Sequence, residues 1–83
     1  MGTTVLDTTL YRIDPEQNMA RYYSITIHPN LFGGQSLMRT WGRIGSEGQT
    51  LIDYFEDEVA AAQAQAQLLL AKTKRGYNQQ AHC

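Results

Sequence analysis

Hydrophobic and polar residues alternate along the first two thirds of the chain, as they do in strands that bury one face. The alternation is clearest in residues 21–28, where Tyr23, Ile25 and Ile27 share one side. Segments separated by Pro and Gly residues repeat this pattern three more times, and such short connections predict antiparallel pairing of consecutive strands. The predicted strands are residues 4–13, 21–28, 35–44 and 49–55.

The period of the pattern changes after the last of these segments. Residues 57–74 are rich in Ala, Gln and Leu and contain no Gly or Pro, which predicts a helix. Asp57 is the expected N-cap, and Gly76 is the expected C-terminal stop. Helical spacing predicts a buried stripe formed by Phe55, Val59, Ala62, Ala66, Leu69 and Thr73. The fold class is therefore α+β: an antiparallel meander sheet of four to five strands, with one C-terminal α-helix packed across one face.

The length of the chain, 83 residues, suits one small domain over residues 1–83, with a core at about 4–77 and a polar tail at 78–83. No apolar run reaches the roughly 20 residues of a membrane span. The N-terminus lacks the basic and apolar regions of a signal peptide. We therefore expect a cytoplasmic protein that does not contact a membrane. The only cysteine is Cys83, so no internal disulfide is expected.

Charge is distributed unevenly along the chain. The formal net charge is −1, yet no acidic residue lies between Gln17 and Ser46 or after Glu58. Six of the seven basic residues fall in these two stretches, so the fold is able to gather them on one side. These six residues are Arg21, Arg39, Arg43, Lys72, Lys74 and Arg75.

The segment around the only Trp carries the most specific chemistry. In a strand, residues two apart face the same side, so Arg39, Trp41 and Arg43 form a row of two cations around one large ring. A flat aromatic ring between guanidinium groups suits a sugar-phosphate end of a nucleic acid. Gly42 has no side chain, which leaves the opposite face open to the close approach of another backbone.

Several motifs resemble the WGR domain, a module named for its Trp-Gly-Arg sequence. The run Trp41-Gly42-Arg43-Ile44-Gly45 matches its central motif, and Tyr22-Tyr23, Leu31-Phe32-Gly33 and the basic, aromatic-ended stretch 72–77 match its flanking motifs. The family is best known from DNA-dependent poly(ADP-ribose) polymerases. The resemblance implies contact with DNA near a strand break, with Trp41 packed on the sugar at a 5′ end and Arg43 at a phosphate or a neighbouring domain.

The candidate nucleic-acid-binding residues combine this motif with the remaining cations and the aromatic residue after the helix. They are Trp41, Arg43, Arg39, Arg21, Lys72, Lys74, Arg75 and Tyr77. Structural alternatives stand beside most of these roles. Trp41 is alternatively a core residue, and Arg43 alternatively pairs with Glu47 or Asp53. Tyr77 is alternatively a staple that pins the end of the helix to the sheet, and the cations near it are alternatively a solvated helix end.

No pattern of catalytic residues accompanies these motifs. The sequence has no Ser-His-Asp arrangement, phosphate-binding loop or cluster of metal ligands, so we expect neither an enzyme nor a cofactor or metal site. The first predicted function is a nucleic-acid-binding module for DNA ends or nicks, with modest affinity because about two to four phosphate contacts are available. The second is a protein-interaction module that uses the same Trp/Arg face or an exposed sheet edge. Oligomeric state is not predicted.

Overall fold

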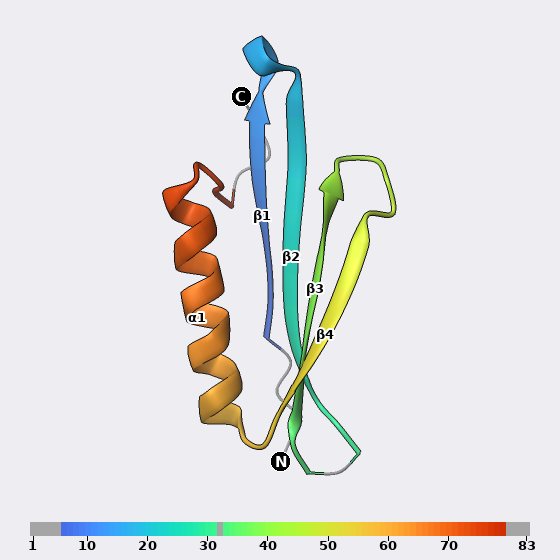
Figure 1. Cartoon of the computed structure of the whole chain (residues 1–83), viewed down its shortest axis with the longest axis vertical. Coiled ribbons are helices and arrows are strands. Elements are labelled where there is room, and N and C mark those ends of the chain that lie inside the picture. The colour runs from blue at the N-terminus through green and yellow to red at the C-terminus, as the bar shows by residue number, and fades with distance from the viewer. Residues whose placement is uncertain (1–5, 32, 80–83) are drawn as a thin grey trace.

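A four-stranded antiparallel sheet and one C-terminal helix make up the computed structural model, which describes residues 6–31 and 33–79 (Figure 1). The strands follow one another as a meander, in the order β1-β2-β3-β4, and the prediction of an α+β meander is confirmed. The elements are β1 (Leu6–Asp14), the short 3₁₀ turn η1 (Pro15–Gln17), β2 (Met19–Pro29), β3 (Gln35–Arg43), β4 (Gln49–Phe55) and α1 (Glu58–Lys74).

Local chemistry explains where these elements begin and end. The Asp14 side chain accepts a hydrogen bond from the backbone N–H of Glu16, and Asn18 has a left-handed φ of 52° that turns the chain into β2. The Asp57 side chain caps α1 by accepting from the N–H of Ala60 at 2.8 Å, as predicted. Gly76, with φ of 98°, follows the end of the helix.

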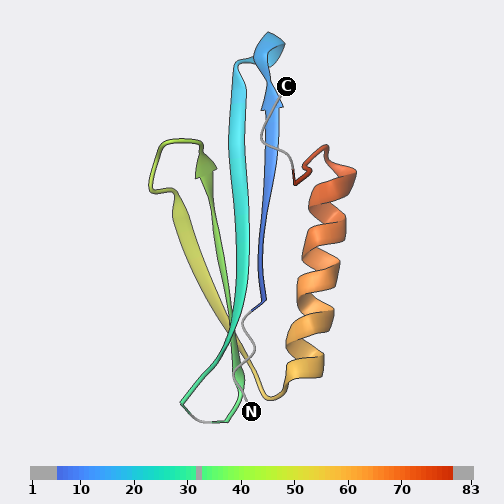
Figure 2. The same cartoon turned by 180° about the vertical axis from the view of Figure 1, so that it is seen from behind.

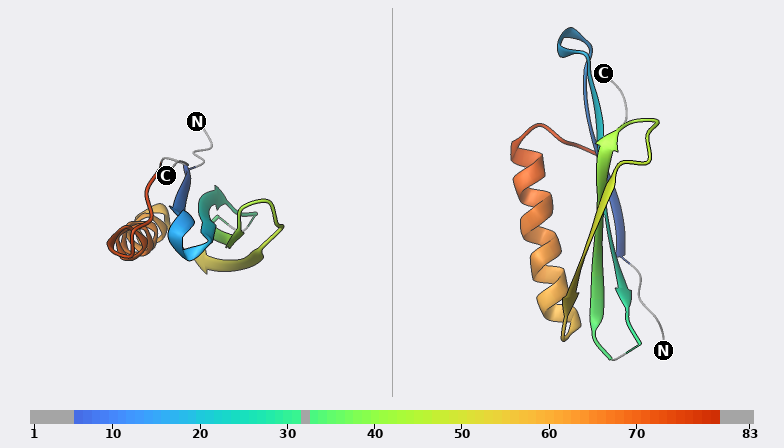
Figure 3. Two further views of the ribbon diagram at one scale, coloured as in Figure 1. Left: turned by 90° about the horizontal axis from the view of Figure 1, so that it is seen from above. Right: turned by 45° about the vertical axis from the view of Figure 1, so that its right-hand side comes forward.

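The helix covers one face of the sheet, and none of the described helices or strands covers the other face (Figure 3, right). β1 and β4 are the outer strands, and the β1–β2 hairpin extends past the C-terminal end of α1 (Figures 1 and 2). The core lies between the two layers, where Ile25 and Leu37 are fully buried. Each such side chain contributes about 1.5–3 kcal/mol to folding. The other core residues are Leu10, Tyr23, Ile27, Ala61 and Tyr77.

The predicted buried stripe of the helix is only partly right, because Phe55 and Leu69 pack against the core whereas its other four members are exposed. Ala61 and Gln65 are the buried positions of α1, whereas Val59 is 65% exposed. Alanines at 60, 61 and 62 occupy positions about 100° apart around the axis, so hydrophobicity favours no single face. The face that packs on the sheet carries Ala61 together with Ala64, Leu68 and Leu69, so the two leucines of the last turns lie against the core.

The chain stays attached to the sheet one residue beyond its predicted core. The backbone N–H of Tyr11 donates to the carbonyl of Asn78, and the N–H of Asn78 donates to the carbonyl of Tyr11 at 2.9 Å. Asn78 is therefore held to the sheet although it was expected in the tail, and the last residues of that predicted tail, 80–83, lie outside the described part. Within the described ranges, no helix is long and apolar enough to cross a membrane.

Candidate nucleic-acid interface

The Trp-Gly-Arg segment ends strand β3 beside the turn into β4. Gly42 lies on the open face, where a Cβ would be 2.8 Å from the Cα of Gly48. The turn folds back over this position, and the Tyr22 hydroxyl holds it by donating to the carbonyl of Glu47 at 3.0 Å. The close backbone approach predicted for Gly42 is therefore present, and it comes from this chain's own turn.

Trp41 and Arg43 lie on the face that the helix covers. Trp41 is half-buried and packs against the core, while part of its ring faces two surface pockets. Both readings of this residue thus hold in part, since one side of the ring is core and the other is accessible. Arg43 is exposed and donates to the carbonyl of Asn18 at 3.1 Å, and among the described residues it forms no ion pair with Glu47 or Asp53, the predicted alternative.

Three arginines form a row across adjacent strands. Arg12 lies opposite Arg21, and Arg21 lies opposite Arg43. Like charges placed directly opposite one another destabilise a sheet. The one ion pair in the part of the chain that the structure describes joins Arg39 to Asp53, so no described carboxylate neutralises this row. We refer to Arg12, Arg21 and Arg43 as the arginine row.

A pocket of about 370 Å³ adjoins this row near the C-terminal end of the helix. Its walls come from β2, β3 and the end of α1, and none of its lining residues is acidic. We call it the arginine pocket. Its lining residues are Arg21, Trp41, Gly42, Arg43, Lys72 and Tyr77.

A second pocket of about 300 Å³ lies between α1 and strands β2 and β3. We call it the tyrosine pocket, because Tyr23 forms part of its wall. Arg39 also lines it, and its guanidinium bonds to Asp53 at 3.2 Å. Trp41 and Lys72 border both pockets, so the two hollows adjoin across this pair. The other lining residues are Leu68, Ala71 and Arg75.

Lys72 stands at the centre of this cationic surface. Its ammonium lies 4.8 Å from the centroid of the Tyr23 ring and 5.3 Å from that of Tyr77, which are cation–π distances. Burial lowers the pKa of Lys72 below its ordinary value, and repulsion from Arg75, Arg21 and Arg39 lowers it further. A bound anion would relieve that repulsion.

The remaining candidate residues differ in how exposed they are and in which pocket they line. Tyr77 is only 8% exposed, so it acts as the predicted staple and offers a wall rather than a free stacking platform. Arg75 lines the tyrosine pocket. Lys74 is exposed and lines neither pocket.

Arg12 is the cation that sequence reasoning missed, because acidic residues flank it at positions 7 and 14. Pairing across the tight β1–β2 turn places it opposite Arg21, and its guanidinium approaches Gly76. The sequence held one signal for Arg12: pairing the two strands predicted on either side of the turn at residues 15–18 brings position 12 opposite position 21.

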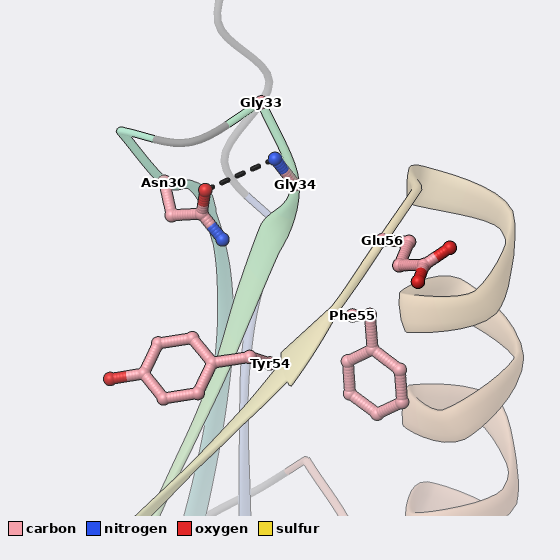
Figure 4. Close-up of a pocket in the computed structure, with 6 residues that line it drawn as sticks. All are labelled: Asn30, Gly33, Gly34, Tyr54, Phe55 and Glu56. Carbon is pink, nitrogen blue, oxygen red and sulfur yellow. Dashed lines mark hydrogen bonds between the residues drawn. The ribbon is translucent and has the colours of Figure 1, made fainter.

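The opposite end of the molecule carries a pocket of different character, about 330 Å³ in volume (Figure 4). The Asn30 side chain closes its loop by accepting from the N–H of Gly34 at 3.0 Å. The Phe55 ring points toward α1, while the Tyr54 ring points to the other side of the strand. Glu56 is the only charged lining residue, so this pocket does not suit an anion. Residues 6–31 and 33–79 contain no cluster of three or more His, Cys, Asp or Glu side chains that would hold a metal ion.

The comparison with known families agrees with this geometry. A model of the WGR domain matches residues 6–83. The chain belongs to the WGR family. This match spans the sheet, the helix and both cationic pockets.

Two bacterial proteins are similar to this WGR chain. Protein y4dW of Sinorhizobium fredii is 52% identical over 66 residues, which cover 80% of this chain and 32% of that protein. Protein YehF of Escherichia coli is 44% identical over 48 residues, which cover 58% of this chain and 18% of that protein. The chain thus spans a third or less of the length of either relative. No solved structure matches the chain significantly.

Proposed function

We propose that this WGR protein binds the sugar-phosphate backbone of DNA with its arginine row and arginine pocket. The observation that carries the proposal is the row itself, in which Arg12, Arg21 and Arg43 lie side by side with no described carboxylate to neutralise them. Such an arrangement works against folding. Local conflicts of this kind concentrate at functional sites, where a ligand supplies the missing partner.

The shape of the surface favours a strand end over a continuous duplex. A pocket accepts a group that projects, and a DNA backbone projects a sugar and a terminal phosphate where a strand is broken. Trp41 offers part of an apolar ring to the sugar, while Arg21 and Lys72 supply charge on the other walls. Membership of the WGR family supports the same target, because the family resemblance implies contact with DNA breaks.

The number of available cations bounds the affinity. Arg12, Arg21, Arg43 and Lys72 are the cations at this surface, which matches two to four phosphate contacts. The logarithm of the binding constant should then fall with the logarithm of salt concentration with a slope between about −2 and −4. Binding is therefore expected to be modest, and measurable chiefly at low salt.

Fluorescence anisotropy with a labelled duplex tests the proposal. The probe carries one 5′-phosphorylated nick, and a closed duplex of the same sequence without ends or nicks is the comparison. We expect the nicked probe to bind more tightly, and we expect Arg21→Gln and Arg43→Gln each to weaken binding and reduce the salt slope by about one.

Lys74→Gln is the matched comparison, since it removes the same charge from an exposed position outside both pockets. It should change the affinity less than either arginine variant. Absence of binding to either DNA at low salt, or equal losses from all three variants, would contradict the proposed interface.

A protein-binding role is the second candidate, and the outer strand β4 favours it. An outer strand presents unpaired backbone groups, and β4 also exposes Ile52 to 44% and Tyr54 to 72%. Size-exclusion chromatography with light scattering over a range of concentrations tests this role. Self-association that Ile52→Lys abolishes would support it, and a concentration-independent monomer mass would argue against pairing between copies.

A further inference from the structure

Strand β4 is an outer strand that lacks most of the features by which such edges avoid further pairing. The strand, Gln49–Phe55, contains no Lys, Arg, Pro or Gly, and its one charged residue, Asp53, forms an ion pair with Arg39 of β3. Its pairing with β3 runs without a bulge. Leu51 and Ile52 point to opposite faces of the sheet, yet each is 44% exposed. The centre of β4 is therefore open on both faces.

The other outer strand, β1, is better protected. It carries charged side chains at Asp7, Arg12 and Asp14. Its outer edge is also engaged, because the backbone of Tyr11 exchanges two hydrogen bonds with that of Asn78. A strand added to β1 would have to displace Asn78, so β4 is the edge that accepts a new strand at lower cost.

The hydrogen bonds of the sheet fix which backbone groups of β4 point outward. The N–H of Ile44, just after β3, donates to the carbonyl of Ala20 at 2.8 Å. By the alternation of an antiparallel ladder, even-numbered residues of β3 bond to β2 and odd-numbered residues bond to β4. Trp41 lies opposite Gln49, so odd-numbered residues of β4 bond back to β3. The outward N–H and C=O groups of β4 therefore belong to Thr50, Ile52 and Tyr54.

We propose that β4 pairs antiparallel with β4 of a second copy of this chain, with Ile52 of one copy opposite Ile52 of the other. Thr50 of each copy then lies opposite Tyr54 of its partner, so every outward residue forms a hydrogen-bonded pair. Each such pair exchanges two bonds, which gives about six backbone hydrogen bonds across the interface. A shift of two residues in either direction loses one of these pairs. This inference rests on the second candidate function, protein binding at β4, and names its partner.

The side chains favour the same register. On the open face, the two Ile52 side chains meet at the two-fold axis, and Tyr54, 72% exposed in one copy, packs beside Thr50 of the other. On the face that carries the helix, Asp53 lies opposite Leu51. A shift of two residues in one direction would instead place Asp53 opposite Asp53, and like charges directly opposite one another destabilise a sheet.

This pairing also determines how the two copies present their cationic surfaces. Its two-fold axis is perpendicular to the sheet, so both copies of α1 and both arginine pockets lie on the same face of one continuous sheet. A single dimer then holds two DNA strand ends on one side, a consequence that rests on the DNA-binding proposal.

Disulfide cross-linking tests the register, in a Cys83→Ser background that removes the native thiol. Ile52→Cys should form a linked dimer under mild oxidation, because residues opposite each other in a hydrogen-bonded pair have Cα atoms about 5.5 Å apart, within reach of a disulfide. Thr50→Cys is the matched control on the same face of β4. Its two copies lie about 14 Å apart along the strand direction and should not link. Mixed copies of Thr50→Cys and Tyr54→Cys should link to each other.

Non-reducing electrophoresis and light scattering decide the outcome. Selective linkage of Ile52→Cys, with a dimer mass for the wild type, supports the inference. A monomer mass at every concentration, or equal linkage of Ile52→Cys and Thr50→Cys, overturns it. A wild-type dimer that Ile52→Lys abolishes, but in which Ile52→Cys does not link, overturns this register and leaves protein binding at β4 standing.

Energy transfer between two differently labelled nicked duplexes tests the shared face of the arginine pockets. It should rise with the wild type and not with Ile52→Lys, which keeps its arginine pocket and should still bind one duplex. Absence of transfer with a wild type that is dimeric and binds DNA overturns this placement of the pockets. The cross-linking result does not depend on DNA, so failure of the DNA-binding proposal and failure of this inference are distinguishable.

Discussion

Replacement of Gly42 by Ala is the most direct test of why the central motif contains glycine. The added Cβ would lie 2.8 Å from the Cα of Gly48 and 3.2 Å from the Oγ of Ser46. Carbon atoms in favourable contact are about 3.5–4.0 Å apart, so the turn must move away by about 0.7–1.2 Å. That movement stretches the hydrogen bond from the Tyr22 hydroxyl to the carbonyl of Glu47.

The expected loss of stability follows from two opposing terms. Overpacking of this kind costs about 1–3 kcal/mol. Alanine in the middle of a strand recovers about 0.5–1 kcal/mol relative to glycine, because glycine loses more backbone freedom on folding. The central values of these two terms, about 2 and about 0.75 kcal/mol, leave a loss of about 1 kcal/mol in the free energy of unfolding of Gly42→Ala, which corresponds to about 4–8 °C in the unfolding midpoint of a domain of this size.

Urea denaturation followed by the fluorescence of Trp41 measures this change, and a double-mutant cycle with Tyr22→Phe identifies its cause. Tyr22→Phe alone should cost about 0.5–1.5 kcal/mol, the worth of its hydrogen bond. In the Gly42→Ala background it should cost less, because the turn has already moved. Thr40→Ala, on the same face of β3, removes a hydroxyl bonded to Thr50 and should be additive with Tyr22→Phe.

Two results would refute this reasoning. One is a Gly42→Ala variant as stable as the wild type, which would mean that the turn does not press on position 42. The other is strict additivity of Gly42→Ala with Tyr22→Phe, which would mean that the turn and the tyrosine are not coupled.

Three other substitutions each remove one contact or charge, and their expected effects on stability or binding follow from that loss. Asp57→Ala should lower the free energy of unfolding by about 0.5–2 kcal/mol in urea denaturation, because the bond to the N–H of Ala60 is lost, and Asn at this position should restore it. Lys72→Met should weaken DNA binding in the anisotropy assay without loss of stability at pH 7. Lys72 of the unfolded chain keeps its proton up to its ordinary pKa of 10.5, whereas the lowered pKa of the folded protein releases that proton at a lower pH. Between these two pKa values, the stability of the wild type should therefore rise with pH relative to that of Lys72→Met in pH-dependent denaturation. Asp53→Asn removes the described ion-pair partner of Arg39 and should lower the free energy of unfolding in urea denaturation by less than about 1 kcal/mol, because Asp53 is half exposed; a loss clearly above about 1 kcal/mol would mean that the pair is less screened by solvent than its exposure indicates.

Short-range chemistry made the elements predictable. Proline or glycine marks at least one end of each strand, and an acidic cap and a glycine mark the ends of the helix, so nearby residues largely decide where these elements begin and end. That Trp41 and Arg43 lie on the same face of β3 follows in the same way, from the two-residue period of a strand.

The candidate site was predictable only in part, because its charges come from residues far apart in the sequence. The position of Arg12 opposite Arg21 depends on hairpin register, and the pairing of Arg39 with Asp53 depends on how β3 meets β4. The phase of α1 was likewise misread at Val59, since an alanine-rich helix has no hydrophobic face strong enough to orient it alone.

The sequence by itself therefore determined a four-stranded meander, its capped helix, and a Trp-Gly-Arg strand with both large side chains on one face. Only the tertiary structure decided that Trp41 is half core and half pocket wall, and that Arg12 joins two other arginines. It also placed the buried hydroxyl of Tyr23 beside the guanidinium of Arg39. The reason is physical: backbone conformation responds to the nearest few residues, whereas burial, charge pairing and hydrogen-bond satisfaction depend on which surfaces the folded chain brings together.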